Sequence, residues 1–336
     1  MNNRLGKRKF ITTAISVIMY IGLVYSQDCS EGYTYFSELP ETATIMSDTP
    51  GVVPDSCLYI DDLGVLNDII SANSLDYPDP INVGNQTWKY GRLTGLVASY
   101  EPNGSNGVNA QLTVLPESFG NFDSLAVLYL EWNGLTSLPT SFSQLTNLAG
   151  LTINNNWLTS LPSDFGNLNQ LIFLDLGFNQ LASVPESICQ LENLQYLWLF
   201  NNQLESVPDC MCNLNIDWSG FDGGGYPNFG IGANHLCDNV PLCIENSANF
   251  ELTLDQFYYS ISEFAPQECC PDLGDINGDG NWNVLDIVMV ANCVLEDNCP
   301  AIEYGCVAGD LNEDGGYNVL DIVALANCVL ADTCGG

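Results

Sequence analysis

The sequence predicts an α/β repeat solenoid followed by a small all-α domain. Leucine and asparagine recur with a period of 23 residues through the middle of the chain, which is typical of stacked repeats. Near the C-terminus, one loop-and-helix sequence occurs twice with an offset of 35 residues. The third observation is that basic residues and then an apolar run begin the sequence, which predicts that the chain is exported.

Residues 1–26 are typical of a secretory signal peptide. Four basic residues precede an apolar run of 16 residues from Phe10 to Tyr25, which is shorter than the roughly 20 residues that a membrane span needs. Cleavage after Ser26 would leave Gln27 as the first mature residue. We therefore expect a secreted protein, outside the cell or on its surface, with an uncleaved anchor as the alternative.

The chain is strongly acidic. It has 41 acidic and six basic residues, and loss of the signal, which holds four of the basic residues, lowers the net charge from −35 to −39. Such a surface repels nucleic acid and anionic lipid, so neither is an expected partner. Divalent cations in a calcium-rich or saline medium would screen the self-repulsion. Fourteen cysteines in an exported chain indicate disulfide bonds.

Residues 27–87 are expected to form an N-terminal cap. A repeat buries its apolar edge only against its neighbours, so the first repeat needs a covering element. Cys29 and Cys57 are the expected disulfide of this cap. The spacing of apolar residues predicts an amphipathic helix over Asp61–Ala72.

The repeats share the pattern L-x-x-L-x-L-x-x-N-x-L, followed by Leu-Pro or Val-Pro. Alternate leucines would point inward from a short strand, and the proline would end that strand and start the convex return. The asparagine is expected to bind neighbouring backbone through its amide, so that the repeats form a ladder beneath the strands. The ladder residues would be Asn133, Asn156, Asn179 and Asn202.

This pattern resembles the leucine-rich repeat family over about residues 88–245, most closely the subclass with Leu-Pro in each repeat. The resemblance implies an arc with parallel strands on its concave face, which binds a protein, peptide or glycan. Aromatic side chains exposed in register favour such recognition, although loops or the last domain could shield part of them. The expected concave-face residues are Tyr129, Trp132, Thr152, Asn155, Phe173, Asp175, Phe178, Tyr196, Trp198 and Asn201, with Trp132, Tyr129, Phe178 and Trp198 as anchors.

The cysteines leave several pairings open. Cys189 and Cys212 occupy the same position in adjacent repeats, and the spacing of about 4.8 Å between stacked strands would allow them to bridge. In the last domain, a shared spacing favours one local bridge in each copy, Cys293 with Cys299 and Cys328 with Cys334. The predicted boundaries are 1–26 for the signal, 27–87 for the N-terminal cap, 88–215 for the repeats, 216–248 for the C-terminal cap, 249–270 for a linker and 271–336 for the last domain.

Two segments of the last domain have the pattern of a twelve-residue calcium loop. Oxygen-bearing side chains lie at loop positions 1, 3, 5, 9 and 12, glycine lies at position 6, and any residue can bind through its carbonyl at position 7. Carboxylates this close repel one another, so a cation is expected between them. Both loops end in Asp, at Asp286 and Asp321, where the ordinary helix-loop-helix has Glu.

The duplicated loop and helix resemble the type I dockerin domain over roughly 271–336. The resemblance implies a calcium-folded module that docks onto a cohesin domain, and it implies two Ca²⁺ sites. Val284-Leu285 and Val319-Leu320 depart from the Ser/Thr-type residues that many dockerins have there, which leaves the partner open. The implied ligands are Asp275, Asn277, Asp279, Asn281, Asn283 and Asp286 in the first loop, and Asp310, Asn312, Asp314, Gly316, Asn318 and Asp321 in the second.

The function predicted from these features is that of a secreted adaptor without enzymatic activity. No nucleophile, metalloprotease or phosphate-loop motif occurs in the chain. The arc would bind a protein or glycan ligand, and the calcium-loaded domain would attach it to a cohesin-type partner or to another copy of the chain. Two alternatives remain: a structural subunit of a surface layer or filament, and an accessory component of a polysaccharide-degrading complex.

Overall fold

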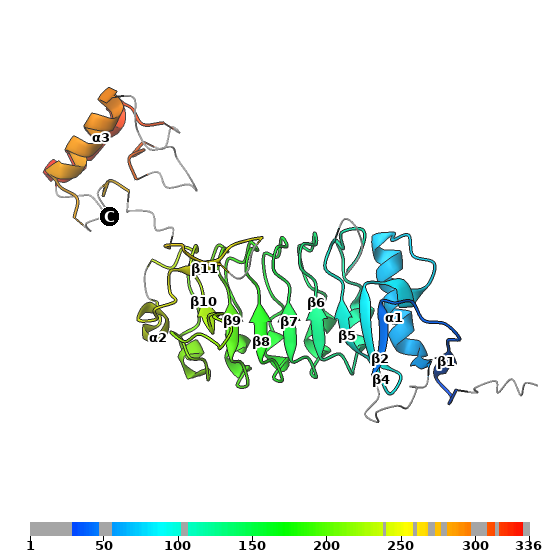
Figure 1. The fold of residues 1–336 in the computed structure, drawn as a ribbon. Coiled ribbons are helices and arrows are strands. Elements are labelled where there is room, and N and C mark those ends of the chain that lie inside the picture. Colours follow the sequence, from blue (N-terminus) through cyan, green and yellow to red (C-terminus); the bar gives the residue numbers. More distant parts are fainter. Residues whose placement is uncertain are drawn as a thin grey trace, which may run out of the picture.

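Eight short strands stack side by side into one sheet in this computed structural model (Figure 1). The structure describes residues 29–46, 56–101, 107–237, 240–257, 261–267, 273–276, 281–296, 308–312 and 316–331. The order of the strands is β10-β9-β8-β7-β6-β5-β4-β2. Their bounds are β2 Ala43–Met46, β4 Asn85–Lys89, β5 Arg92–Val97, β6 Val127–Tyr129, β7 Gly150–Thr152, β8 Phe173–Asp175, β9 Tyr196–Trp198 and β10 Phe229–Gly230.

The leucine period sets the register of this sheet. Leu128 pairs with Leu151, Leu151 with Leu174, and Leu174 with Leu197, so one buried leucine column runs through β6 to β9. Neighbouring strands are parallel except β4 and β5, which form an antiparallel pair. The predicted repeat arc with parallel strands is therefore confirmed.

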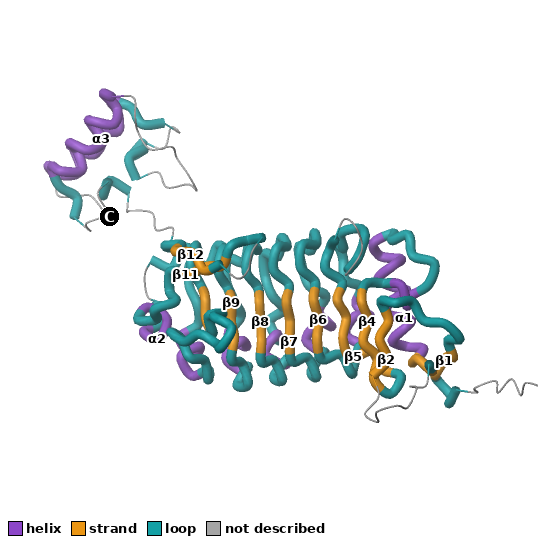
Figure 2. Tube along the Cα trace, in the orientation of Figure 1, coloured by secondary structure: helices purple, strands orange, loops and turns teal. Residues whose placement is uncertain are grey.

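Short 3₁₀ helices carry the chain back along the opposite side of the arc (Figure 2). Most of them begin directly after the proline of the repeat, because its fixed φ suits the first turn. Phe119, Phe142 and Phe165 stack between successive returns, with ring centroids 5.9 and 6.4 Å apart. The helices are η2 Glu117–Asn121, η3 Thr140–Gln144, η4 Phe165–Asn167, η5 Glu186–Gln190 and η6 Asp209–Asn213.

The asparagine ladder is also present. The Asn156 amide nitrogen donates to the carbonyls of Leu130 and Ile153, and its oxygen accepts from the Leu135 N–H at 3.0 Å. Asn133, Asn179 and Asn202 make the corresponding bonds in their repeats. Each buried amide thus satisfies backbone groups of two adjacent repeats, which joins the repeats by hydrogen bonds as well as by leucine packing.

The N-terminal cap contains the predicted helix, α1 Ile60–Asn73, with Leu63, Leu66 and Ile69 buried against the first strands. β1 Tyr33–Tyr35 pairs with β3 Cys57–Tyr59, and η1 Pro80–Asn82 follows the helix. The Cys29–Cys57 disulfide forms as expected. Asp62, which is fully buried, accepts two hydrogen bonds from the Arg92 guanidinium and one from the Leu93 N–H.

The expected bridge between Cys189 and Cys212 is wrong. The structure joins Cys189 to Cys210 and Cys212 to Cys243. Cys189, Cys210 and Cys212 lie on the 3₁₀ returns η5 and η6, and Cys243 lies on α2 Leu242–Glu245. Cys189 faces the residue 21 positions later on the next return and not its equivalent 23 positions later. Ser143 contacts Asp164 with this same offset of 21. Cys299 and Cys334, in the other predicted pairs, lie outside the described residues.

The segment predicted as the C-terminal cap contains one further strand of the sheet. β10 pairs in parallel with β9, and Asn234 extends the ladder by accepting from the Leu204 N–H at 3.0 Å. Helix α2 Leu242–Glu245 follows it. A hairpin of β11 Leu252–Leu254 and β12 Ser262–Phe264 then returns over the sheet. We call the described residues 249–257 and 261–267 the strap.

The last domain is built on two helices, α3 Val284–Glu296 and α4 Val319–Ala331. Of their apolar side chains, Val290 and Leu325 are the buried ones, and these residues are equivalent in the 35-residue duplication. So few buried apolar side chains on the two helices agree with the calcium-folded module that the resemblance implies, because a small apolar core needs further support. Across the described ranges, no helix is long and apolar enough to cross a membrane, and the predicted signal lies outside them.

Candidate calcium-binding loops and binding groove

The carboxylates at the ends of both predicted calcium loops are buried. Asp286 and Asp321 are 0 % exposed, and Asp275 and Asp310 are at most 3 % exposed. The sequence from 271 to 336 contains no Lys, Arg or His, so no basic side chain of the domain can neutralise them. Buried carboxylates of this kind are stable only when paired or bound to a metal, and hard oxygen donors suit Ca²⁺. The residues present therefore fit the expected cation.

Asp at loop position 12 also closes each loop. The two oxygens of Asp286 accept hydrogen bonds from the Ile276 N–H at 3.0 Å and the Asn283 N–H at 2.8 Å. Asp321 likewise accepts from the N–H groups of Asn312 and Asn318, at 3.2 and 2.8 Å. Each of these carboxylates thus joins the start of its loop to the start of the following helix.

Asn at loop position 9 caps that helix. The Asn283 amide oxygen accepts from the Leu285 N–H at 2.8 Å, and its nitrogen donates to the Asn281 carbonyl. Asn318 repeats this with Leu320 and Gly316. N-cap residues satisfy the first helical N–H groups in this way. Sequence reasoning assigned these residues only as ligands; a residue at position 9 often binds calcium through a water molecule, which is compatible with capping. Asn277, Asp279 and Asp314 lie outside the described residues.

The predicted concave-face residues do not form one exposed stripe. The expectation that Trp198 is exposed is wrong: its side chain is 4 % exposed, and its indole N–H donates to the Pro227 carbonyl at 2.8 Å. Its ring packs edge-on against Phe173, with centroids 4.9 Å apart, and shares a small buried cluster with Phe200 and Leu254. Leu254 belongs to the strap, so the segment predicted as a linker is what covers this part of the face.

Other predicted residues of the face are also buried. Asp175 is 0 % exposed and accepts from the Asn154 amide and the Gly177 N–H, while Thr152 and Asn155 are buried too. Tyr129 remains exposed at 39 %, and Phe173 and Tyr196 are half-buried. Alternation along a strand indicates which side chains point away from the core of the arc. It does not indicate whether a segment distant in sequence, such as the strap, covers those side chains.

The remaining predicted residues border a hollow of about 450 Å³ at one edge of the strands. Trp132, Asn155, Phe178 and Asn201 occupy equivalent positions in four successive repeats and are called the edge column here. All four have positive φ, at 60°, 53°, 51° and 51°. Sequence reasoning missed Gln111, Trp157, Gln180 and Gln256, which complete the lining; Trp157 and Gln180 directly follow ladder asparagines, a regularity that could have placed them here.

The strap forms one wall of this hollow, which we call the edge groove. The Gln256 amide donates to the Asn155 side-chain oxygen at 2.8 Å, and the Phe257 ring stacks on Trp132 with centroids 5.4 Å apart and an interplanar angle of 21°. The Asn201 amide donates to the Thr253 hydroxyl at 2.5 Å. Residues more than 50 positions apart thus meet at the groove.

No lining residue of the edge groove carries a charge; all eleven are amides or aromatics. Glu131 precedes Trp132 in sequence but accepts a hydrogen bond from the Ser99 hydroxyl at 2.6 Å. Burial raises the pKa of Glu131, and the Ser99 hydrogen bond opposes that shift. The groove therefore offers hydrogen bonds and ring faces rather than ionic contacts.

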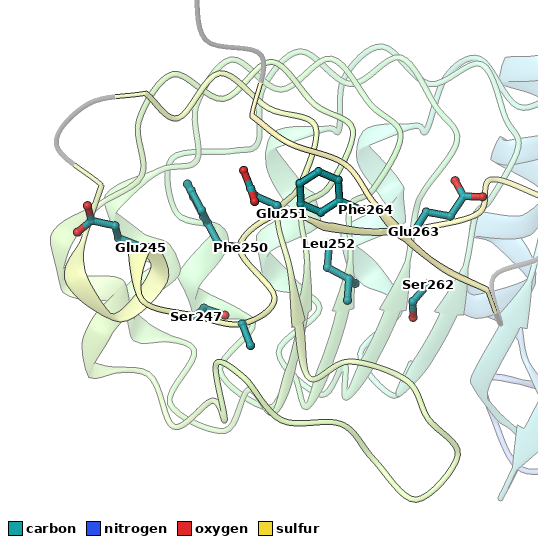
Figure 3. Close-up of a pocket in the computed structure, with 9 residues that line it drawn as sticks. Glu245, Ser247, Phe250, Glu251, Leu252, Ser262, Glu263 and Phe264 are labelled. Atoms are coloured by element: carbon teal, nitrogen blue, oxygen red, sulfur yellow. The ribbon is translucent and has the colours of Figure 1, made fainter. Parts of the chain in front are cut away.

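A second hollow of about 390 Å³ lies along the strap itself (Figure 3). Phe250, Leu252 and Phe264 supply its apolar part. The carboxylates of Glu245, Glu251 and Glu263 point to separate places around it, and among the described residues they do not form a metal-binding cluster. This hollow therefore lacks the convergent groups of a cation site.

Comparison with known proteins agrees with both parts of the fold. Residues 169–210 match the family model of leucine-rich repeats, in two copies, and residues 273–330 match that of the type I dockerin domain. The chain carries leucine-rich repeats and a type I dockerin domain. Dockerin domains in general bind calcium and dock onto cohesins, and both families are interaction modules. No match is found among curated proteins.

Several solved structures resemble the repeat arc. A leucine-rich-repeat protein of Leptospira interrogans is 31 % identical with a TM-score of 0.33, and the match covers 43 % of this chain and 40 % of that one. A plant ice-binding protein is 22 % identical with a TM-score of 0.41, over 53 % and 57 % of the two chains. The ectodomain of a receptor kinase from Arabidopsis thaliana is 21 % identical with a TM-score of 0.40, over 52 % and 92 %. The chain thus spans about half or less of the length of the first two.

Proposed function

We propose that this protein is a secreted, non-enzymatic adaptor, in which the repeat arc binds a ligand and the calcium-loaded dockerin domain attaches the complex to a cohesin-type partner. Export is supported by the signal-like start of the sequence and by the disulfides of the arc. Two Ca²⁺ ions would be held by the paired loops, through Asp275, Asp286, Asp310 and Asp321 and the loop residues between them.

The observation that carries this proposal is a duplicated apolar surface on the dockerin domain. Leu285 and Leu320 are 60 % and 59 % exposed, and they are equivalent in the two copies. Further exposed pairs with the same offset are Val284 and Val319, Val288 and Val323, and Leu295 and Leu330. So many exposed aliphatic side chains on so small a domain support a role in protein binding.

The partner surface should be apolar with a neutral or basic rim. The dockerin domain holds twelve acidic and no basic residues between 271 and 336, so an acidic partner would be repelled. Calcium is required indirectly, because the loop carboxylates set the start of each helix that carries the apolar side chains. Docking should accordingly be lost when calcium is removed.

Binding to an immobilised panel of type I cohesins tests the proposal, with the full mature chain in calcium and in chelator. The double variant Leu285→Asp/Leu320→Asp should bind at least about 30-fold more weakly, as expected when central apolar contacts of an interface are lost. Leu242→Asp, on α2 of the arc and 72 % exposed, is the matched control and should bind normally.

The alternative structural role makes a different prediction. If calcium drives concentration-dependent polymerisation of the pure chain, and Leu285→Asp/Leu320→Asp prevents it, the duplicated surface binds another copy rather than a cohesin. Light scattering of the parent and the double variant separates the two outcomes. Absence of both cohesin binding and polymerisation would contradict the adaptor proposal.

A further inference from the structure

We propose that the edge groove is a binding site for an uncharged oligosaccharide, which names the ligand class of the recognition arm and so rests on the adaptor function proposed above. The site contains four of the predicted concave-face residues, those at the rim of the sheet beside the strap, and not the whole predicted face. Four observations support it: the alternation of the edge column, the backbone conformation of that column, the free groups beside it, and the absence of charge.

The edge column alternates aromatic and amide side chains. Trp132 is followed by Asn155, Phe178 and Asn201, one from each repeat. Neighbouring strands are about 4.8 Å apart, so the two aromatic rings lie about two strand spacings from each other. Each unit of a sugar chain carries both an apolar C–H face and hydroxyl groups, so a chain laid along the column could contact its half-buried rings and its amides in turn.

The backbone of the edge column favours Asn and disfavours aromatics. Asn tolerates positive φ, whereas large side chains adopt it rarely. Trp132 and Phe178 nevertheless have φ of 60° and 51°. Residues held in sparsely populated backbone regions concentrate at functional sites. Each of these aromatics also packs inside the protein, Trp132 on Phe257 and Phe178 on Phe200, and both remain half-buried where they line the groove.

A second column offers unused groups. Gly134, Trp157 and Gln180 occupy equivalent positions in successive repeats. Trp157 is 56 % exposed. Gly134, at the equivalent position of the preceding repeat, has no side chain that could cover the Trp157 ring. Within the described part of the chain, neither the Trp157 indole N–H nor the Gln180 amide is hydrogen-bonded, so both can bind hydroxyl groups.

The lack of charge narrows the ligand class. The protein has 41 acidic residues, yet none lines the groove. A basic peptide would find no carboxylate in the groove to pair with, and an anionic polysaccharide would be repelled by the surrounding surface. Amide and indole groups on an aromatic floor match the hydroxyls and the apolar C–H faces of a neutral sugar.

A glycan array that carries neutral and anionic oligosaccharides tests this inference with the full calcium-loaded chain. Neutral oligosaccharides should bind, and the strongest of them is then titrated by calorimetry. Trp157→Ala should weaken its affinity at least tenfold, and Gln180→Leu, which keeps the size of the side chain, should weaken it severalfold. Tyr90→Ala, in the turn between β4 and β5 and 72 % exposed, is the matched aromatic control and should bind as the parent does.

Three results would overturn the inference. The first is that the chain binds anionic glycans alone or no glycan, and the second is that Trp157→Ala keeps the affinity of the parent. The third is that the parent selects a peptide from a displayed library and the Trp157→Ala variant does not bind that peptide. The third result would assign the groove to a protein partner. Cohesin binding, measured on the same samples, reports separately on the adaptor proposal, because the dockerin domain does not contain these residues.

Discussion

Single residues of the arc serve packing or recognition according to what covers them. Trp132 and Trp198 both contact the strap, yet Trp198 is buried beneath it, whereas Trp132, stacked on Phe257, stays half-buried and borders the edge groove. The difference arises from Pro227 and Leu254, which contact Trp198 from segments outside its own repeat. Residue type and repeat position alone therefore do not assign a role.

Replacement of Trp198 by Ala should lower stability rather than merely ligand affinity. The change removes a buried ring and the hydrogen bond to Pro227, so we expect a loss of about 3–5 kcal/mol in the free energy of unfolding of the arc. Denaturant titration followed by circular dichroism measures it. Tyr129→Ala, at an exposed position on β6 of the same sheet, should change stability by less than about 0.5 kcal/mol. Equal stability of the two variants would contradict the burial described here.

At the scale of elements, the 3₁₀ returns are packed as tightly as the strands. A Cβ placed on Gly166 would lie 1.9 Å from the Ser187 carbonyl oxygen, and backbone cannot yield easily at such a contact. The Gly166 N–H also donates to the Ser187 hydroxyl at 3.1 Å. Stacking of the returns thus requires a residue without a side chain here.

Gly166→Ala should therefore lower the free energy of unfolding by about 1–3 kcal/mol through overpacking. Gly150→Ala is the matched control, because a Cβ at Gly150 has no atom within 4 Å and its φ is ordinary. Thermal melts of both variants give the melting temperatures to be compared. A melting temperature of Gly166→Ala at or above that of Gly150→Ala would show that the returns can separate.

The calcium loops allow a similarly specific test. Asp286→Asn and Asp321→Asn keep the shape of the carboxylate but remove its charge, so each should abolish one calcium site. Calorimetry should find two sites in the parent and one in each variant. Glu296→Gln, at the exposed end of α3, makes the same charge change away from the loops and should retain both sites. Two sites in either Asp variant would mean that position 12 is not a ligand.

Much of this element-scale structure follows from sequence periodicity. The 23-residue period predicted the strands, the ladder and the returns that begin after a proline. These predictions were possible because equivalent residues make the same contacts in each repeat. The Cys189 pairing was missed because the returns face each other with an offset of 21 residues. β10 was missed because an insertion after Asn213 breaks the period. The burial of Trp198 and the edge groove depend on the strap, whose contacts no local pattern encodes.

At the scale of the whole molecule, the two parts obtain their stability differently. The arc has a continuous core of leucine, phenylalanine and valine, and its described residues include the disulfides Cys29–Cys57, Cys189–Cys210 and Cys212–Cys243. The dockerin domain buries one apolar side chain on each helix and concentrates twelve acidic residues. Ca²⁺ that binds only the folded domain stabilises it by mass action.

Chelation of calcium should therefore unfold the dockerin domain and leave the arc intact. Hydrogen exchange followed by mass spectrometry should show faster exchange for the described residues between 273 and 331 in chelator, with β6 to β9 unchanged. Return of calcium should restore protection. Unchanged exchange in α3 and α4 would contradict metal-dependent folding, and faster exchange in the arc would show that the two parts unfold together.

The strap also determines where a mechanical load enters the arc. Tension applied through the dockerin domain reaches the chain at residues 261–267, where the Ala265 carbonyl accepts from the Ala233 N–H and the Gln267 amide donates to the Ile231 and Phe250 carbonyls. Because the strap lies against the same repeats that form the edge groove, a ligand held there and a dockerin held by its partner pull on neighbouring strands. The N-terminal cap with β2 and β4 lies outside this load path, so a tethered complex can bear force without separation of the sheet from its N-terminal end.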